Sequence, residues 1–341
     1  MPARYAVRAL LPTSEHASVP VGYVAEILNR PGTTVRAATL SRRKDLQRQI
    51  LRAFRPPFAA TVRSGPIGPP PPPEVFPLIV KPAGLSGSRG IKVVTGPDEW
   101  RALPVESQDR IAESFVPGPE YSVEAVFAET RLRFAGVARK TVNATFAEVG
   151  HLAGPDVLAG TDRRRLIKAA ERVAAVAGLQ TGFLHAEFKL ADGGPQLIEF
   201  AVRPPGDALV QLHSLTIGQP LEDVMLAAHL QEPTQTPEVK AAAAQVYLRQ
   251  DTTGPLRAVV SGATACPVVY LGDGEPWPSA PTWHDHCIIG LVHVRRGSPV
   301  TRVETNFERI ASVVAHASDS SALPGPDELG AALRIEVNLT S

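Results

Sequence analysis

The spacing of apolar and polar positions divides the chain into short strands and a few helices. The clearest helix is predicted over residues 161–178, where apolar side chains recur every three or four positions. A second amphipathic helix is predicted over residues 41–55, with Ser41 as its N-cap, Leu46 on its apolar face and Pro56 ending it. Shorter helices are expected near residues 97–103, 219–230 and 305–316.

Strand patterns dominate the rest of the chain. Residues 77–129 are expected to form strands and turns, residues 182–202 a hairpin, and the chain from about residue 236 a strand-rich region. Residues 61–74 contain five consecutive prolines and predict an extended spacer without regular structure. The whole pattern predicts a mixed α+β protein.

Composition and charge exclude several classes of protein. Lys and Arg number 35 against 34 Asp and Glu, so a formal charge of +1 gives no electrostatic footprint for nucleic acid or an anionic membrane. No apolar run approaches the roughly 20 residues of a membrane helix, and the N-terminus lacks a signal-peptide pattern. Two cysteines give no disulfide framework. We therefore expect a cytoplasmic protein that binds neither nucleic acid nor membranes.

The stretch LIVKPAGLSGSRGIKVV at residues 78–94 places a lysine before a glycine-rich loop, with strand patterns on both sides. A Walker A loop or a dinucleotide fingerprint would need a helix after the glycines. The context instead favours a hairpin flap, in which the amides of Ser86, Gly87 and Ser88 point at phosphate and Lys81 supplies a charge. An ordinary flexible hairpin with a surface lysine explains the stretch equally well when it is considered alone.

Two glutamates form the second group of candidate residues. If the hairpin is centred on Gly193, Glu187 and Glu199 face each other with Cβ atoms about 5 Å apart. Like charges at this distance are unfavourable unless a cation lies between them, and Mg²⁺ prefers carboxylate oxygens. Arg203 is expected on the same face of the second strand, where it could stabilise a phosphoryl or carboxylate charge. The alternative is an exposed sheet face in which neighbouring side chains relieve the repulsion.

These segments together, with ESFVPGPEYSVE at residues 113–124 between them, occur in an order and spacing that resembles the ATP-grasp superfamily. The resemblance runs from about residue 20 to the C-terminus and is strongest to carboxylate–amine ligases that include the L-amino-acid ligases. It implies an α+β ATP-grasp fold, in which two α+β subdomains grip ATP. The implied parts are a truncated N-terminal segment with the Pro-rich spacer, a lid subdomain, a catalytic core and a C-terminal strand-rich subdomain, at residues 1–74, 75–125, 126–235 and 236–341.

The resemblance also implies roles for individual residues. Lys44 and Lys81 would contact the ATP phosphates, and Glu187 and Glu199 would hold Mg²⁺, with Mn²⁺ as an alternative ion. Arg203 would act with Lys81 as a catalytic residue that stabilises the acyl-phosphate step. Further nucleotide contacts are implied in the flap and at the adenine and ribose, for Ser86, Gly87, Ser88, Gly90, Glu113, Val116 and Glu120.

The implied chemistry is a two-step ligation of small molecules. A carboxylate attacks the γ-phosphate of ATP to give an acyl phosphate and ADP, and an amine then displaces phosphate. The segment TFAEVGHLAGPD at residues 145–156 resembles the substrate side of the family, so Glu148, His151 and Asp207 are candidates for contacts with the carboxylate or the amine. Two alternatives stay open, a degenerate ATP-grasp protein that binds nucleotide or a partner without ligation, and a ligase that acts on a carrier-protein thiol.

The sequence departs from the family pattern at two places. In the family, the second metal-binding strand has the pattern E-x-N-x-R, and its asparagine ligates the ion. Ala201 occupies the position of that asparagine here. Only 43 residues precede Lys44, so part of the N-terminal α/β domain is expected to be missing. A homodimer or a partner protein that completes this domain is therefore expected as one explanation.

Overall fold

The computed structural model of the chain describes residues 6–250, 252–262, 266–277 and 288–338. The chain divides into two compact units, and each unit is assembled from segments that lie far apart in sequence. The first unit comprises Met1–Val137, Thr161–Pro205 and Glu222–Thr236, and the second comprises Ala138–Gly160, Gly206–Leu221 and Pro237–Ser341. No helix in the described part of the chain is long and apolar enough to cross a lipid bilayer.

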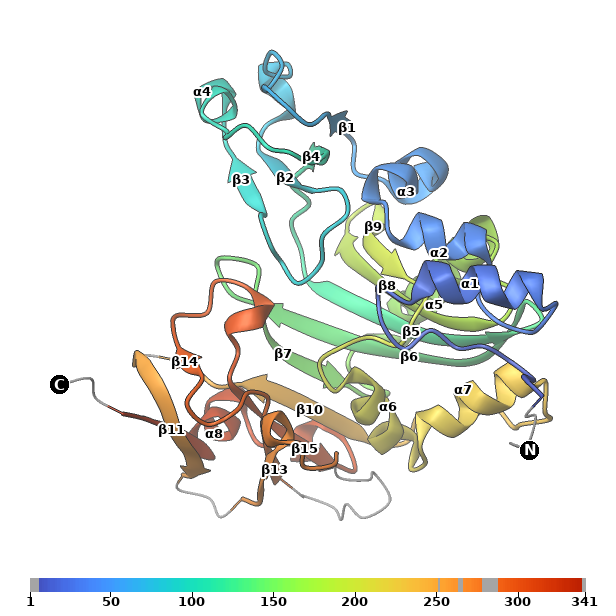
Figure 1. Cartoon of the computed structure of the whole chain (residues 1–341), viewed down its shortest axis with the longest axis vertical. Coiled ribbons are helices and arrows are strands. Elements are labelled where there is room, and N and C mark those ends of the chain that lie inside the picture. The colour runs from blue at the N-terminus through green and yellow to red at the C-terminus, as the bar shows by residue number, and fades with distance from the viewer. Residues whose placement is uncertain (1–5, 251, 263–265, 278–287, 339–341) are drawn as a thin grey trace, which may run out of the picture. The chain divides into compact units, whose positions relative to one another are not determined.

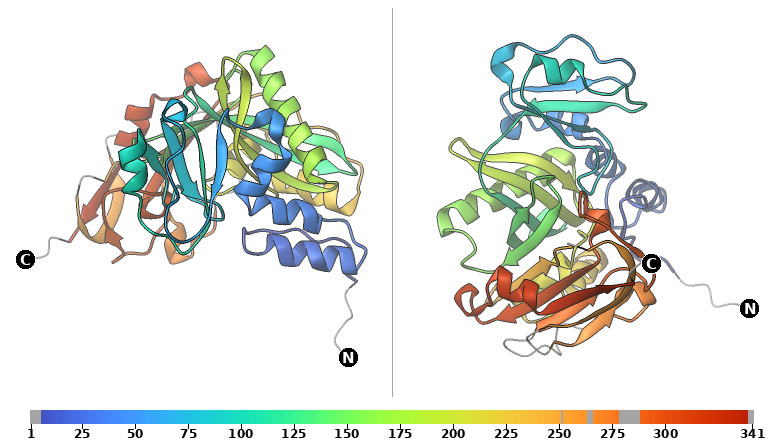
Figure 2. Two further views of the ribbon diagram at one scale, coloured as in Figure 1. Left: turned by 90° about the horizontal axis from the view of Figure 1, so that it is seen from above. Right: turned by 90° about the vertical axis from the view of Figure 1, so that its left-hand side faces the viewer.

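A small antiparallel sheet in the first unit contains the glycine-rich loop. Its strand order is β1-β4-β2-β3, and these strands form one group with the short helix α4 (Figure 2). The bounds are Ala59–Val62 for β1, Leu78–Pro82 for β2, Lys92–Val94 for β3, Arg110–Ser114 for β4 and Pro97–Arg101 for α4. The hairpin flap and the short helix are confirmed. The spacer is shorter than predicted, because β1 includes Thr61 and Val62 and pairs with β4.

Three helices precede this sheet, namely α1 (Ser18–Ile27), α2 (Val35–Ser41) and α3 (Lys44–Ile50), and α1 and α2 lie side by side (Figure 1). The helix predicted over residues 41–55 is confirmed in part by α3, but its predicted start is wrong, because Ser41 ends α2 rather than capping α3. The chain is extended at Arg43, with φ −132°, because the Lys44 backbone N–H donates to the carbonyl of Ala83 at 3.0 Å. A tertiary hydrogen bond has replaced the helical one at this point.

The larger sheet of the first unit has the strand order β6-β5-β8-β9. Its bounds are Arg131–Val142 for β6, Glu120–Ala128 for β5, Gly182–Ala191 for β8 and Gly194–Ala201 for β9, and β6 continues into the second unit. Helix α5 (Gly160–Ala177) and helix α7 (Leu221–Leu230) belong to the same part of the chain. The predicted hairpin over residues 182–202 and the predicted helices over residues 161–178 and 219–230 are confirmed.

The main sheet of the second unit has the order β12-β13-β15-β10-β7-β6. The bounds are Glu148–Ala153 for β7, Ala242–Tyr247 for β10, Val268–Tyr270 for β12, Ile288–Val292 for β13 and Ala311–Ala317 for β15. A three-stranded sheet and two helices complete the unit, with bounds Pro299–Val300 for β14, Gly254–Ser261 for β11, Leu333–Val337 for β16, Leu209–Ile217 for α6 and Pro326–Ala331 for α8.

The helix expected near residues 305–316 is wrong. Only a single 3₁₀ turn forms at Asn306–Glu308, and strand β15 follows it. This strand lies between β10 and β13, and its side chains, including Val313 and Val314, are almost all buried. Because Val313 and Val314 belong to separate core clusters, both faces of the strand are buried and its apolar positions do not alternate with polar ones. Periodicity alone could therefore not distinguish it from a buried helix.

Candidate functional site

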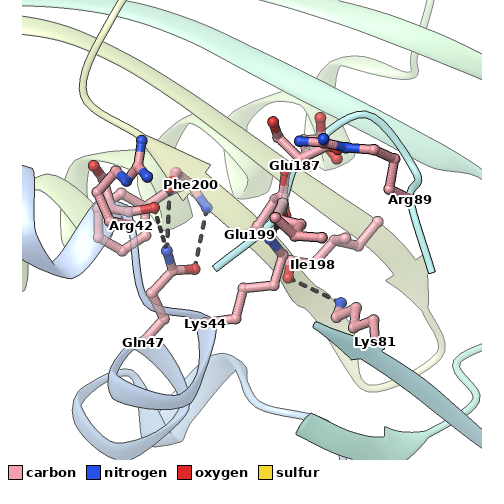
Figure 3. Close-up of polar contacts among 12 residues, drawn as sticks. Arg42, Lys44, Gln47, Lys81, Arg89, Glu187, Ile198, Glu199 and Phe200 are labelled. Atoms are coloured by element: carbon pink, nitrogen blue, oxygen red, sulfur yellow. Dashed lines mark hydrogen bonds and ion pairs between the residues drawn. The ribbon is translucent and has the colours of Figure 1, made fainter. Parts of the chain in front are cut away.

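Helix α3 turns polar side chains rather than apolar ones into the first unit. The buried residues of this helix are Lys44, Asp45, Gln47 and Arg48. The Gln47 amide nitrogen lies 3.1 Å from the carbonyl of Leu40, 3.2 Å from that of Ser41 and 3.1 Å from that of Phe200 (Figure 3). These bonds join the end of α2 to strand β9. The apolar face predicted to include Leu46 is only partly buried, because the polar face is the one that packs inward.

Lys44 connects the glycine-rich loop to one of the two glutamates. Its Nζ donates to the carbonyl of Leu85 at 2.6 Å and lies 2.6 Å from Oε2 of Glu199. The Lys44 and Glu199 side chains are 11% and 28% exposed, so this ion pair is partly screened from water. A cation is thereby fixed between the flap and the carboxylate.

Lys81 takes part in a buried triad with Glu113 of β4 and Arg48 of α3. The Glu113 carboxylate lies 2.6 Å from Lys81 Nζ and 2.7 Å from Arg48 Nε. Burial alone would raise the pKa of Glu113, but the charges of Lys81 and Arg48 outweigh burial and lower this pKa to about 2. The adenine contact that the family resemblance implies for Glu113 stays a prediction, and in this structure the carboxylate serves two cations.

The loop between β2 and β3 adopts backbone conformations that most residues avoid. Its left-handed positions, with φ of +70°, +61° and +70°, are Gly87, Ser88 and Gly90. The Arg89 side chain closes the loop, since its Nε donates to the carbonyl of Ser86 at 3.1 Å. Arg89 is directed toward Glu187 (Figure 3). The flap is therefore a shaped loop that carries a cationic side chain, and its contact with phosphate stays a prediction.

Strands β8 and β9 place Glu187 directly opposite Glu199, so the predicted pairing is confirmed. It arises from a two-residue turn combined with a bulge at Ile198, rather than from the symmetric hairpin expected from the sequence. The carbonyl of Ile198 accepts a hydrogen bond from Arg48 Nη2 at 2.6 Å. It accepts a second one from Lys81 Nζ at 3.5 Å (Figure 3). The bulge thus ties the carboxylate hairpin to the buried triad.

Comparison with known proteins identifies this arrangement. Residues 74–211 match the model of the ATP-grasp domain. The chain is similar to an L-amino acid ligase from Bacillus licheniformis, with a TM-score of 0.75 and 18% identity over 97% of this chain and 81% of that one. It is also similar to phosphoribosylglycinamide synthetase from Anaerococcus prevotii, with a TM-score of 0.69 and 14% identity over 96% and 81% of the two chains. The chain has an ATP-grasp fold.

This finding confirms the resemblance and the α+β fold class predicted from the sequence. Among curated sequences, the uncharacterized protein y4rH of Sinorhizobium fredii is 25% identical over 328 residues. That match covers 89% of this chain and 62% of the relative, so the chain spans about 62% of the relative's length. At these identities the ATP-grasp neighbours show the fold and leave the substrate open.

The facing carboxylates of Glu187 and Glu199 fit the hard divalent cation that ATP-grasp enzymes use with ATP, because both offer oxygen ligands from one sheet face. Glu187 is oriented by His185, whose Nε2 lies 3.0 Å from Glu187 Oε1 and whose Nδ1 lies 2.7 Å from Glu124 Oε1. Burial lowers the pKa of His185, but the two carboxylates outweigh it and raise this pKa to about 9. Ala201 lies opposite His185 and offers no side-chain ligand, so the asparagine ligand of the family pattern has no counterpart there.

Arg203 lies beyond the end of β9, so its predicted place on the strand face is wrong. Strand β9 ends at Ala201, and the chain turns away at Pro204 and Pro205. The Arg203 Nε donates to Oε2 of Glu15 at 2.6 Å, across 188 residues of sequence. Sequence reasoning missed Glu15, because a single glutamate in the loop before α1 gives no pattern.

The remaining nucleotide candidates lie between and within neighbouring strands. Val116 belongs to the segment that connects β4 and β5, and Glu120 is the first residue of β5. Lys189 of β8 pairs with Glu120 in register, and its Nζ lies 3.7 Å from Glu120 Oε2. The ribose contact proposed for Glu120 stays a prediction.

The second unit brings the three substrate candidates together. His151 Nε2 lies 3.1 Å from Glu148 Oε2 and 3.5 Å from Asp207 Oδ2. Two further cations, which the family resemblance did not assign, complete this cluster. Lys140 Nζ lies 3.1 Å from Glu148 Oε1, and Arg309 donates to both carboxylate oxygens of Asp207.

Glu148, His151 and Asp207 lie close enough together to hold a metal ion, and Lys140 and Arg309 are cations that contact their carboxylates. Burial lowers the pKa of His151, but Asp207 and Glu148 outweigh burial and raise this pKa to about 9. The cluster therefore combines two carboxylates with Lys140, Arg309 and the His151 imidazole in direct contact with them.

Proposed function

We propose that the chain is an ATP- and Mg²⁺-dependent ligase that activates a carboxylate as an acyl phosphate and joins it to an amine, with formation of an amide or peptide bond. The observation that carries the proposal is the facing pair Glu187–Glu199 with the Lys44 ammonium 2.6 Å from Glu199. The Lys81 ammonium belongs to the same unit. Two carboxylates for a divalent cation and two lysines for phosphate are the parts that phosphoryl transfer from ATP requires.

In the proposed reaction the protein supplies position and charge. Mg²⁺ would neutralise phosphate oxygens when it is bound to Glu187 and Glu199. Lys44, Lys81 and the amides of the glycine-rich loop would orient the triphosphate, while Arg203 would stabilise the acyl phosphate. The substrate carboxylate oxygen bonds to the γ-phosphorus as the bond to ADP breaks, and the amine nitrogen then bonds to the acyl carbon as phosphate leaves.

The second unit would supply recognition of the substrate. Its cluster of Lys140, His151 and Arg309 around two carboxylates suits the carboxylate group of a small molecule, and Glu148 or Asp207 suits an amine. The proposal covers the class of both substrates, a carboxylate and an amine, and a role of the reaction in small-molecule biosynthesis. The degenerate alternative, in which the chain binds nucleotide without ligation, is favoured by Ala201, which offers no ligand to an ion.

Calorimetric titration tests the nucleotide site directly. ADP and a non-hydrolysable ATP analogue are titrated with and without Mg²⁺ into the wild type, Lys81→Ala and the matched control Lys92→Ala, which alters an exposed lysine of β3. We expect Mg²⁺ to strengthen binding and Lys81→Ala to weaken it at least tenfold, while the control stays within twofold of the wild type. A folded wild type that binds neither nucleotide would contradict the proposal.

Substrate panels then separate the alternatives. ADP release is measured with carboxylates and amines, and separately with carrier-protein thiols. Release with a carboxylate and an amine supports the proposed ligase, whereas release only with carrier thiols supports the thiol alternative. Tight nucleotide binding without release in either panel supports the degenerate alternative.

A further inference from the structure

The arginine proposed to stabilise the acyl phosphate is held at two of its three guanidinium nitrogens. Its Nε donates to Glu15 Oε2 at 2.6 Å, and its Nη1 donates to the carbonyl of Pro204 at 2.8 Å. Among the described residues, Nη2 of Arg203 donates no hydrogen bond to protein. The guanidinium group is therefore held on two of its sides, by Glu15 at Nε and by the Pro204 carbonyl at Nη1.

Glu15 is itself fixed in place. Arg42 Nη1 donates to the backbone carbonyl of Glu15 at 3.0 Å and lies 3.9 Å from its Oε1. The Glu15 and Arg203 side chains are only 22% and 18% exposed, so their ion pair is partly screened from water. If Glu15 only blocked Arg203 until substrate displaced the carboxylate, the backbone of Glu15 would not need the hydrogen bond from Arg42. The contacts describe a fixed support.

We propose that Glu15 is a positioning residue, which orients the guanidinium of Arg203 so that Nη2 meets the phosphoryl oxygens of the ligand. This inference rests on the proposed function, because it assigns Arg203 to phosphate. The charge-assisted bond to Nε sets the plane of the guanidinium group. Without it, rotation of the Arg203 side chain would remove Nη2 from the ligand while Lys44 and Lys81 stayed in place.

The test measures how inorganic phosphate, the product of the amine step, binds to protein saturated with Mg²⁺ and with ADP, the nucleotide product of the phosphoryl-transfer step. Calorimetry is run on the wild type, Glu15→Ala, Glu15→Gln, Arg203→Ala and the double variant Glu15→Ala/Arg203→Ala. Glu171→Ala is the matched control, because Glu171 is an exposed glutamate of α5. The affinity for ADP and the melting temperature are recorded for every variant.

We expect Glu15→Ala to weaken phosphate binding about tenfold, the size of effect associated with losing one charge-assisted hydrogen bond. Glu15→Gln keeps one acceptor oxygen but loses the charge, so a loss of about threefold is expected. The affinity for ADP should stay within twofold. The double variant should match Arg203→Ala alone, because Glu15 acts through Arg203.

Several results would overturn the inference. Unchanged phosphate affinity in Glu15→Ala would do so. An equal loss of phosphate affinity when Glu15→Ala is added to Arg203→Ala would also do so. So would a parallel loss of ADP affinity, because a merely structural role would produce it. Wild-type protein that binds ADP but not phosphate overturns this inference alone, whereas failure to bind ADP overturns the proposed function as well. If Glu15→Ala does not fold, Glu15→Gln gives the same test.

Discussion

Replacing Glu113 with glutamine should destabilise the first unit by about 3 kcal/mol at neutral pH. Glu113, Lys81 and Arg48 are 4%, 6% and 5% exposed, so the substitution leaves two cations buried without a carboxylate. Breaking a buried ion pair in this way costs roughly 3–5 kcal/mol. An independent value follows from the pKa, which is lowered from 4.5 to about 2. At about 1.4 kcal/mol for each tenfold change in proton affinity, this difference corresponds to about 3 kcal/mol.

The sign of the pH dependence follows from the lowered pKa of Glu113. A carboxylate that is more acidic in the folded state stabilises it fully above the unfolded value of 4.5, and this stabilisation is lost as pH falls toward 2. The difference in stability between wild type and Glu113→Gln should therefore be nearly constant from pH 6 to 8. It should shrink below about pH 4.5.

Urea unfolding followed by circular dichroism measures these free energies at each pH. Glu74→Gln is the control, because Glu74 is exposed, and its effect should stay within about 0.5 kcal/mol. The double variant Glu113→Gln/Lys81→Met removes one of the stranded cations and should regain part of the loss. A cost below about 1 kcal/mol for Glu113→Gln at pH 7.5, or no recovery in the double variant, would refute the description of the triad as a coupled buried network.

Three further predictions concern the carboxylates, the second unit and the flap. Glu199→Ala should abolish the strengthening of nucleotide binding by Mg²⁺ in calorimetry, and unchanged strengthening would contradict the metal assignment. His151 should be protonated on both nitrogens at pH 7.5. The stabilisation that its positive charge gives the fold is complete below about pH 6.5 and is lost as pH rises through about 9. A neutral tautomer in nitrogen-15 NMR at pH 7.5 would contradict this. Gly87→Ala should strain the flap by about 1 kcal/mol because φ is +70° there, and weaken nucleotide binding. Gly84→Ala, where an added Cβ would lie 3.7 Å from its nearest neighbour, should do neither, and equal effects of the two substitutions would count against a shaped flap.

The parts of the site that the sequence predicts are those set by local patterns. The glycine-rich hairpin follows from turn residues between two apolar runs, and the pairing of Glu187 with Glu199 follows from strand alternation around a turn signal. Helix α5 follows from its strong 3.6-residue period. Each of these features depends on residues within about 20 positions of one another.

The features that the sequence does not predict depend on contacts between distant segments. The break between α2 and α3 is made by Ala83, which accepts the hydrogen bond of the Lys44 backbone. The support of Arg203 comes from Glu15 at the other end of the unit's sequence. Helix α3 shows the general reason. An apolar pattern predicts the buried face of a helix when that face packs into an apolar core, but the buried side chains of α3 make polar contacts with neighbouring strands.

The buried charge of the first unit also bears on the choice between a ligase and a degenerate protein. Lys81 and Arg48 share the single carboxylate of Glu113, and Lys44 lies on Glu199. Burying cations costs free energy that one carboxylate only partly offsets, and well-packed apolar side chains are often at least as stabilising in such places. A bound polyphosphate would offset this cost, whereas a purely structural role would not require the extra cations. The cost of burying Lys81 and Arg48 on one carboxylate therefore favours the ligase proposal, in which a phosphate anion meets these cations.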